Sequence, residues 1–126
     1  LQQSEEFGIH QGLSLIDGTV IEIPQTEDGS FKRKTPHIGW SALKRPQQQD
    51  WSNSCLKDIE EGEFFYFVHS FTTVPTRPED ELAYCIYEGL PVTAAIQKEN
   101  ITGVQFHPEK SGEAGLKILK QFVTIQ

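Results

Sequence analysis

The sequence of 126 residues has no methionine, only two cysteines and few positive side chains. Cys55 and Cys85 are too few for a disulfide scaffold and form no CxxC pair, so we expect free thiols in a reducing, cytoplasmic compartment. The net charge of −7 makes nucleic acid and anionic membranes poor partners. No apolar run approaches the ~20 residues of a membrane span. The first residues also lack the basic and apolar regions of a signal peptide.

The absence of methionine extends to position 1, which is Leu1. A natural chain begins with methionine unless it is processed, so we expect residues upstream of Leu1 to be missing. The length predicts a single domain over residues 1–126. The hydrophobic content of 37% is ordinary for a soluble protein.

Strand patterns outnumber helical ones. The sequence predicts strands over 20–23, 36–43, 63–71, 82–87, 92–98 and 101–106, and polar loops over 24–35, 44–54 and 72–81. One helix is expected over 113–123, where apolar residues recur at helical spacing and Ser111 is a plausible N-cap. On its own this pattern favours an α+β arrangement. One helix covers too little sheet, so we expect further helices upstream.

His107 and Glu109 flank Pro108 at the end of a predicted strand. Pro108 disfavours helix at His107, so we expect an extended pair with both side chains on one side. The carboxylate could then fix the imidazole tautomer while the other ring nitrogen acts as a base. The residues alone leave two alternatives open. One is a solvated loop histidine beside a helix-flanking charge, and the other is a metal site, for which His-x-Glu is weak evidence.

The stretch GVQFHPEKS resembles the last catalytic motif of class I glutamine amidotransferases, whose triad is Cys, His and Glu. The resemblance extends to SEEFGIHQGLSLIDGTV (4–20), TPHIGW (35–40), FFYFVHSF (64–71) and GVQFHPEKSGEAGLKILKQF (103–122). It is strongest to the branch of glutaminase subunits of imidazole glycerol phosphate synthase. It implies an α/β, flavodoxin-like three-layer fold with a mixed sheet. Residues 1–126 would be its C-terminal portion, strand-rich with a closing C-terminal helix.

The resemblance also implies roles for individual residues. His107 would be the triad base and Glu109 the acid that orients it. Glu6 would hold the α-ammonium group of bound glutamine. Ser70 and Phe71 would present their backbone to the glutamine carboxylate, although tyrosine often stands where this chain has Phe71.

His37 and Trp40, in the PHIGW segment, resemble residues of a region next to the partner enzyme. Aromatic side chains often anchor protein interfaces, so Trp40 is a good interface candidate. Without the resemblance, packing of Trp40 in the core is equally acceptable.

The family nucleophile is a cysteine in a Gly-x-Cys-x-Gly elbow, and neither Cys55 (SNSCLK) nor Cys85 (AYCIY) fits this motif. We expect both cysteines to be structural, with the nucleophile, its elbow and the oxyanion loop upstream of Leu1. This chain alone would then be inactive.

The activity implied by the resemblance is hydrolysis of glutamine to glutamate and ammonia, with no metal or organic cofactor. The ammonia would pass to a cyclase or synthase subunit in a heterodimer of histidine biosynthesis. Two alternatives remain. One is a subunit serving another synthase, such as one that aminates a surface-polysaccharide sugar. The other is a non-catalytic module that binds a partner through the PHIGW face.

Overall fold

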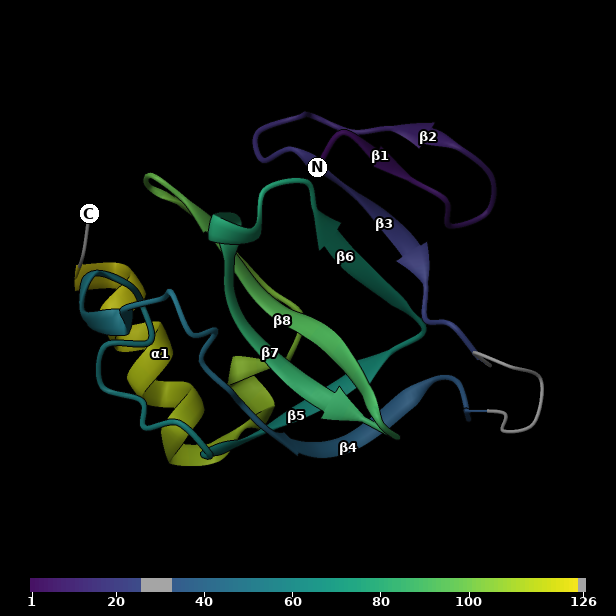
Figure 1. The fold of residues 1–126 in the computed structure, drawn as a ribbon. Coiled ribbons are helices and arrows are strands. Elements are labelled where there is room, and N and C mark those ends of the chain that lie inside the picture. The colour runs from purple at the N-terminus through teal and green to yellow at the C-terminus, as the bar shows by residue number, and fades with distance from the viewer. Residues whose placement is uncertain (26–32, 125–126) are drawn as a thin grey trace.

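The computed structural model describes residues 1–25 and 33–124, so most of the loop predicted over 24–35 lies outside the described residues. Within these ranges the chain forms short strands, three 3₁₀ turns and one α-helix (Figure 1). The strands are β1 (Gln3–Ser4), β2 (His10–Gln11), β3 (Gly18–Glu22), β4 (His37–Ala42), β5 (Phe64–His69), β6 (Phe71–Pro75), β7 (Glu81–Tyr87), β8 (Leu90–Lys98) and β9 (Ile101–Val104). The turns are η1 (Trp51–Asn53), η2 (Pro78–Asp80) and η3 (Pro108–Lys110), and the helix is α1 (Gly112–Thr124).

The first sheet is mixed and has the strand order β2-β1-β3-β6. Strands β1 and β3 run parallel, whereas β1 with β2 and β3 with β6 are antiparallel. Strand β6 pairs from Glu22↔Phe71 to Gly18↔Pro75. The loop predicted over 72–81 is therefore wrong for its first four residues. The β-branched run Thr72, Thr73 and Val74 favours strand, and β3 supplies the hydrogen-bonding edge that it needs.

Two antiparallel sheets complete the described fold, β4-β5 and β7-β8-β9. A single bridge between Lys44 and Tyr84 joins them. Phe65 and Phe67 on β5 are fully buried and alternate with more exposed neighbours, as expected for a strand with one face on the core. The core contains Leu43, Trp51, Cys55, Leu56, Ile59, Phe65, Phe67, Leu82, Ala83, Cys85, Val92, Ala94, Ala95, Phe106 and Ile118.

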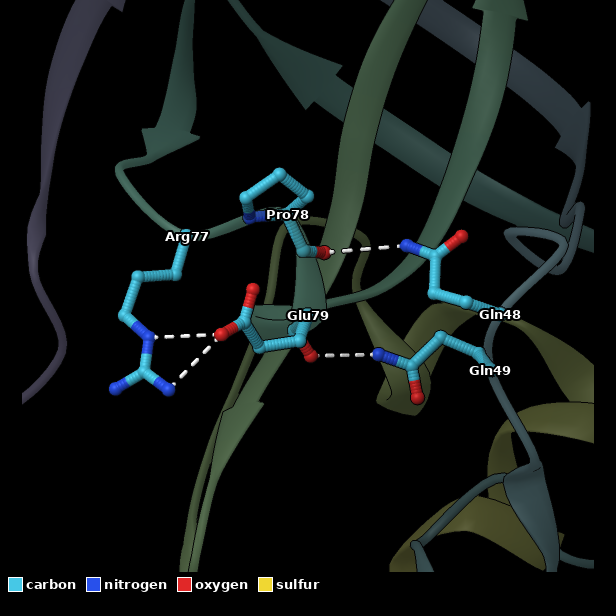
Figure 2. Close-up of polar contacts among 5 residues, drawn as sticks. All are labelled: Gln48, Gln49, Arg77, Pro78 and Glu79. Atoms are coloured by element: carbon cyan, nitrogen blue, oxygen red, sulfur yellow. Dashed lines mark hydrogen bonds and ion pairs between the residues drawn. The ribbon is translucent and has the colours of Figure 1, made fainter.

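The predicted loop over 44–54 is fixed to the connection between β6 and β7. Figure 2 shows the side-chain amides of Gln48 and Gln49 donating to the carbonyls of Pro78 and Glu79, at 3.4 Å and 2.7 Å. On the other side of this connection, Arg77 forms an ion pair with the Glu79 carboxylate at 2.9 Å. Two polar loops therefore hold each other in place through side-chain to backbone bonds.

The helix predicted over 113–123 is confirmed as α1. It packs against the core through Ile118, while the apolar side chains Leu116, Leu119, Phe122 and Val123 are exposed. Most of the apolar stripe therefore faces away from the described core. No helix in residues 1–25 or 33–124 is long and apolar enough to cross a membrane.

Candidate active site

His107 and Glu109 form a hydrogen-bonded pair. His107 Nδ1 lies 2.9 Å from Glu109 Oε1, and the side chains are 39% and 59% exposed. A carboxylate only accepts hydrogen bonds, so Nδ1 carries the proton and Nε2 is the basic nitrogen of the neutral ring. Bonds from the Glu109 backbone N–H and from His107 keep the pKa of Glu109 below its usual value. Within the described residues, Nε2 has no hydrogen-bond partner and can face a substrate.

The backbone brings the pair together by a turn. His107 is extended, with φ −101° and ψ 99°, as expected before proline. Glu109, however, lies in the 3₁₀ turn η3, which is closed by the Lys110 N–H bonding to the His107 carbonyl at 3.0 Å. The expectation that extended alternation joins the two side chains is wrong, because a tight turn does so.

Strand β5 and the start of α1 anchor this turn. The His107 N–H donates to the Tyr66 carbonyl at 3.0 Å. The buried Ser111 hydroxyl accepts from the Tyr66 N–H at 3.0 Å and donates to the His107 carbonyl at 2.7 Å. Ser111, predicted as an N-cap, therefore uses its hydroxyl to join β5 to the catalytic candidate. A Cβ at Gly115 would lie 1.9 Å from the Pro108 carbonyl oxygen, so only glycine permits this approach.

The predicted glutamine-binding residues lie at one end of the first sheet, where β1 and β3 finish and β6 begins. Glu6 follows β1 at the end where β3 also finishes, since the Glu5 N–H donates to the Val20 carbonyl. Ser70 and Phe71 lie where β6 begins, opposite the end of β3. No hydrogen bond or ion pair within the described residues joins Glu6, Ser70 or Phe71 to the His107–Glu109 pair. Their contacts with glutamine stay predictions.

The two residues predicted at a partner interface have opposite environments. Trp40 is 56% exposed, which suits an interface side chain. His37 is only 2% exposed, with its ring stacked on Phe67 at 5.0 Å and on Tyr87 at 4.0 Å between ring centroids. Residues 37 and 40 point to opposite faces of β4, so exposure of Trp40 requires His37 to face inward. The His37 ring is therefore an interior group in this structure.

Sequence reasoning gave no role to His69, which is buried and bonded to His37. His37 Nδ1 lies 2.9 Å from His69 Nε2, and the two residues are paired across β4 and β5. The available signal was that PHIGW and FVHSF each carry a histidine at one end of a predicted strand. Antiparallel pairing of these strands brings the two ends together.

Cys55 and Cys85 are free and buried in the core. Burial raises the pKa of both thiols, to about 12 for Cys85, so neither forms a thiolate readily near neutral pH. This environment agrees with the structural role predicted for them. Among residues 1–25 and 33–124, no group of three or more His, Cys, Asp or Glu side chains could hold a metal ion.

Comparison with known proteins agrees with the sequence motifs. Residues 7–125 match the family model of class-I glutamine amidotransferases. The chain is 45% identical over 126 residues to imidazole glycerol phosphate synthase subunit HisH 1 of Legionella pneumophila (strain Lens), covering 99% of this chain and 59% of the relative. It is 41% identical over 124 residues to the HisH subunit of Wolinella succinogenes, covering 98% and 58%.

A third relative is the HisH subunit of Methanosarcina barkeri, 45% identical over 125 residues, with 98% of this chain and 56% of the relative covered. The chain thus spans somewhat more than half the length of these relatives. The family model covers nearly all of the chain, including the His107–Glu109 motif. The chain belongs to the class-I glutamine amidotransferase family.

Proposed function

We propose that this protein is the glutaminase subunit of an imidazole glycerol phosphate synthase. It would hydrolyse glutamine to glutamate and ammonia and deliver the ammonia to a cyclase subunit in histidine biosynthesis. The observation that carries this proposal is the 2.9 Å bond between His107 Nδ1 and Glu109 Oε1 within the family motif. The HisH relatives favour this synthase over others. The two free thiols fit a reducing cytoplasm.

The pair suits acyl transfer from the glutamine side-chain amide. Glu109 holds the Nδ1–H tautomer of His107, which leaves Nε2 to move protons. His107 takes the proton of the thiol, the thiolate attacks the amide carbon, and the imidazolium gives this proton to the departing ammonia as the thioester forms. Neutral His107 then takes a proton from water, which hydrolyses the thioester and releases glutamate. Glu109 stabilises the imidazolium form of His107, which exists before ammonia leaves and again after water gives up its proton, until that proton returns to the sulfur.

The thiolate in this scheme is a third group, distinct from Cys55 and Cys85. Both are buried with raised pKa values, and no hydrogen bond joins either to His107 in the described residues. We therefore expect the 126-residue chain alone to release no ammonia from glutamine. Activity belongs to the protein that carries this sequence together with the nucleophile.

The outer face of β4 and β5 supports the proposal of a partner subunit. The pairs Ile38–Val68 and Trp40–Tyr66 stand opposite each other on this face, and the Trp40 and Tyr66 rings meet edge-on at 5.9 Å. Phe64 joins Ile38, Trp40 and Val68 as an exposed apolar side chain on this face. Contiguous exposed apolar groups of this kind are typical of interaction surfaces. We place the cyclase contact here, with Trp40 as its anchor.

The test is ammonia release by the natural protein in complex with its cyclase. Substituting His107→Asn or Glu109→Gln should lower kcat, by about 10²–10⁴-fold for His107→Asn. Glu113→Gln, an exposed carboxylate in the first turn of α1, is the matched control and should keep full activity. Cys55→Ser and Cys85→Ser should also remain active.

Two results would contradict the proposal. An active His107→Asn protein would remove His107 from the reaction. Ammonia release that responds only to a different synthase would assign the subunit to that enzyme instead. A Trp40→Ala protein that binds the cyclase as tightly as the wild type would refute the proposed contact face.

A further inference from the structure

Four groups form a hydrogen-bonded chain through the interior. Ser41 Oγ lies 3.0 Å from His37 Nε2, and His37 Nδ1 lies 2.9 Å from His69 Nε2. His69 Nδ1 then lies 2.8 Å from the Phe71 carbonyl oxygen. This hydrogen-bonded chain therefore begins at Ser41 in β4, crosses to His69 in β5 and ends at Phe71, the first residue of β6.

The chemistry of these groups fixes the direction of every bond. The Phe71 carbonyl can only accept, so His69 Nδ1 carries a proton and His69 Nε2 is the acceptor of a neutral ring. His37 Nδ1 must then donate to His69 Nε2, which leaves His37 Nε2 to accept from the Ser41 hydroxyl. One tautomer of each histidine satisfies the whole chain.

Both rings are neutral near pH 7. Burial, and then the neighbouring His69, lowers the pKa of His37 to about 4. Burial also lowers the pKa of His69. The ring of Tyr87 stacks on His37, and its hydroxyl donates to the Lys34 carbonyl at 2.6 Å, away from the two imidazoles. The neutral tautomers derived above are therefore the working state of the chain.

The hydrogen-bonded chain ends at Phe71, the first residue of β6. Ile23 and Ser70 are a hydrogen-bonded pair, with the Ile23 N–H donating to the Ser70 carbonyl at 2.9 Å. In an antiparallel ladder the next residue, Phe71, then turns both its N–H and its carbonyl away from β3. The Ile23–Ser70 bond holds the peptide group that carries the Phe71 N–H, and His69 holds the next one, which carries the Phe71 carbonyl. The Phe71 N–H therefore points away from β3 with its direction restrained from both sides.

We propose that His37 and His69 are positioning residues, which lock the Phe71 carbonyl so that the Phe71 N–H is held ready to bind the α-carboxylate of glutamine. This inference rests on the proposed function, since it supplies the substrate. No hydrogen bond within the described residues joins either ring to the His107–Glu109 pair. The hydrogen-bonded chain fixes the Phe71 backbone before glutamine binds, so less free energy is spent on ordering it during binding. Its loss should therefore raise KM for glutamine more than it lowers kcat.

The bond directions can be tested without any activity. The ¹⁵N spectrum of the histidine rings in the whole protein distinguishes protonated from bare nitrogens. We expect His69 and His37 both to carry the proton on Nδ1, with Nε2 bare, at pH 7. An Nε2–H tautomer at His69 would overturn the inference, because the bond to the Phe71 carbonyl could not then exist.

Substitutions test the effect on glutamine in the natural protein with its cyclase. His69→Phe removes the donor to Phe71 and should raise KM for glutamine about tenfold, the size expected for one lost hydrogen bond, with kcat within about twofold. His69→Asn places an amide N–H near the position of Nδ1 and should restore KM. Phe67→Leu loosens the ring contacts with His37 and His69 but removes none of the hydrogen-bonding groups, so it should lower thermal stability and leave KM unchanged.

An unchanged KM in His69→Phe, or an equal rise in Phe67→Leu, would overturn the positioning role. Either result with an inactive His107→Asn protein would leave the proposed function intact. If His107→Asn remained active, the proposed function itself would fail. The tautomers measured by ¹⁵N would still show whether the hydrogen-bonded chain from Ser41 to Phe71 is present.

Discussion

Replacing Ser111 with alanine is the sharpest test of how the fold holds His107. The Ser111 hydroxyl is buried and makes two bonds, accepting from the Tyr66 N–H at 3.0 Å and donating to the His107 carbonyl at 2.7 Å. Alanine leaves the Tyr66 N–H without this partner, whereas the His107 carbonyl keeps its bond from the Lys110 N–H at 3.0 Å. Each unsatisfied buried backbone group costs ~1–3 kcal/mol. We expect Ser111→Ala to lower the free energy of unfolding by ~1–3 kcal/mol, or roughly 5–10 °C in Tm for a chain of this length.

Urea denaturation followed by circular dichroism measures this change, with the slope m checked for an unaltered unfolding transition. Thr124→Ala is the matched control. Its hydroxyl also donates to a carbonyl four residues earlier, that of Lys120 at 2.7 Å, but at the exposed end of α1. The control should change stability by no more than ~0.5 kcal/mol. Equal effects of Ser111→Ala and Thr124→Ala would refute the argument that burial makes the Ser111 bonds valuable.

Three further predictions follow from the same structure. Gly115→Ala should lower Tm, because the new Cβ would meet the Pro108 carbonyl oxygen at 1.9 Å, and this overpacking of ~1–3 kcal/mol exceeds the ~1 kcal/mol that alanine adds in helix propensity. Since the pKa of His37 falls from 6.5 to about 4 on folding, the unfolded state binds more protons, and the free energy of unfolding should fall as the pH drops from 6.5 towards 4. The slope is about 1.4 kcal/mol per pH unit, and a His37→Phe protein titrated with urea over this range should show a shallower one. Cys55 and Cys85 should react with a thiol reagent only on unfolding, because both are buried and burial raises their pKa values; modification of the native protein at the rate of an exposed thiol would contradict this.

The strands with strong apolar patterns could be predicted from the sequence. The run Phe64 to Val68 predicted β5, and the segments over 82–87 and 92–98 correspond to β7 and β8. The boundary at Ser70 could not be predicted, because the chain continues in extended form on both sides. The strand ends there because the chain changes its hydrogen-bonding partner from β4 to β3. This change depends on the tertiary fold, and no residue near Ser70 indicates it in the sequence.

The His107–Glu109 pair could also be predicted, although by a different geometry from the observed one. Proline at 108 does restrict His107 to extended backbone, but it also begins the 3₁₀ turn that lifts Glu109 back toward the ring. The inward position of His37 was within reach of sequence reasoning. Alternation along PHIGW places residues 37 and 40 on opposite faces, so an interface role for Trp40 already argued against one for His37.

Strand β5 explains why these features occur together. Its inward side chains, Phe65 and Phe67, pack in the core, and its outward side chains form the apolar face that includes Tyr66. The Tyr66 backbone holds His107 through its carbonyl and Ser111 through its N–H. Four residues further on, ~13 Å along an extended backbone, the chain reaches Ser70, which follows the last residue of β5 and lies at the site proposed for the glutamine carboxylate. One strand therefore sets the spacing between the base, the substrate edge and the partner face, since an extended backbone paired on β4 cannot shorten without breaking its ladder.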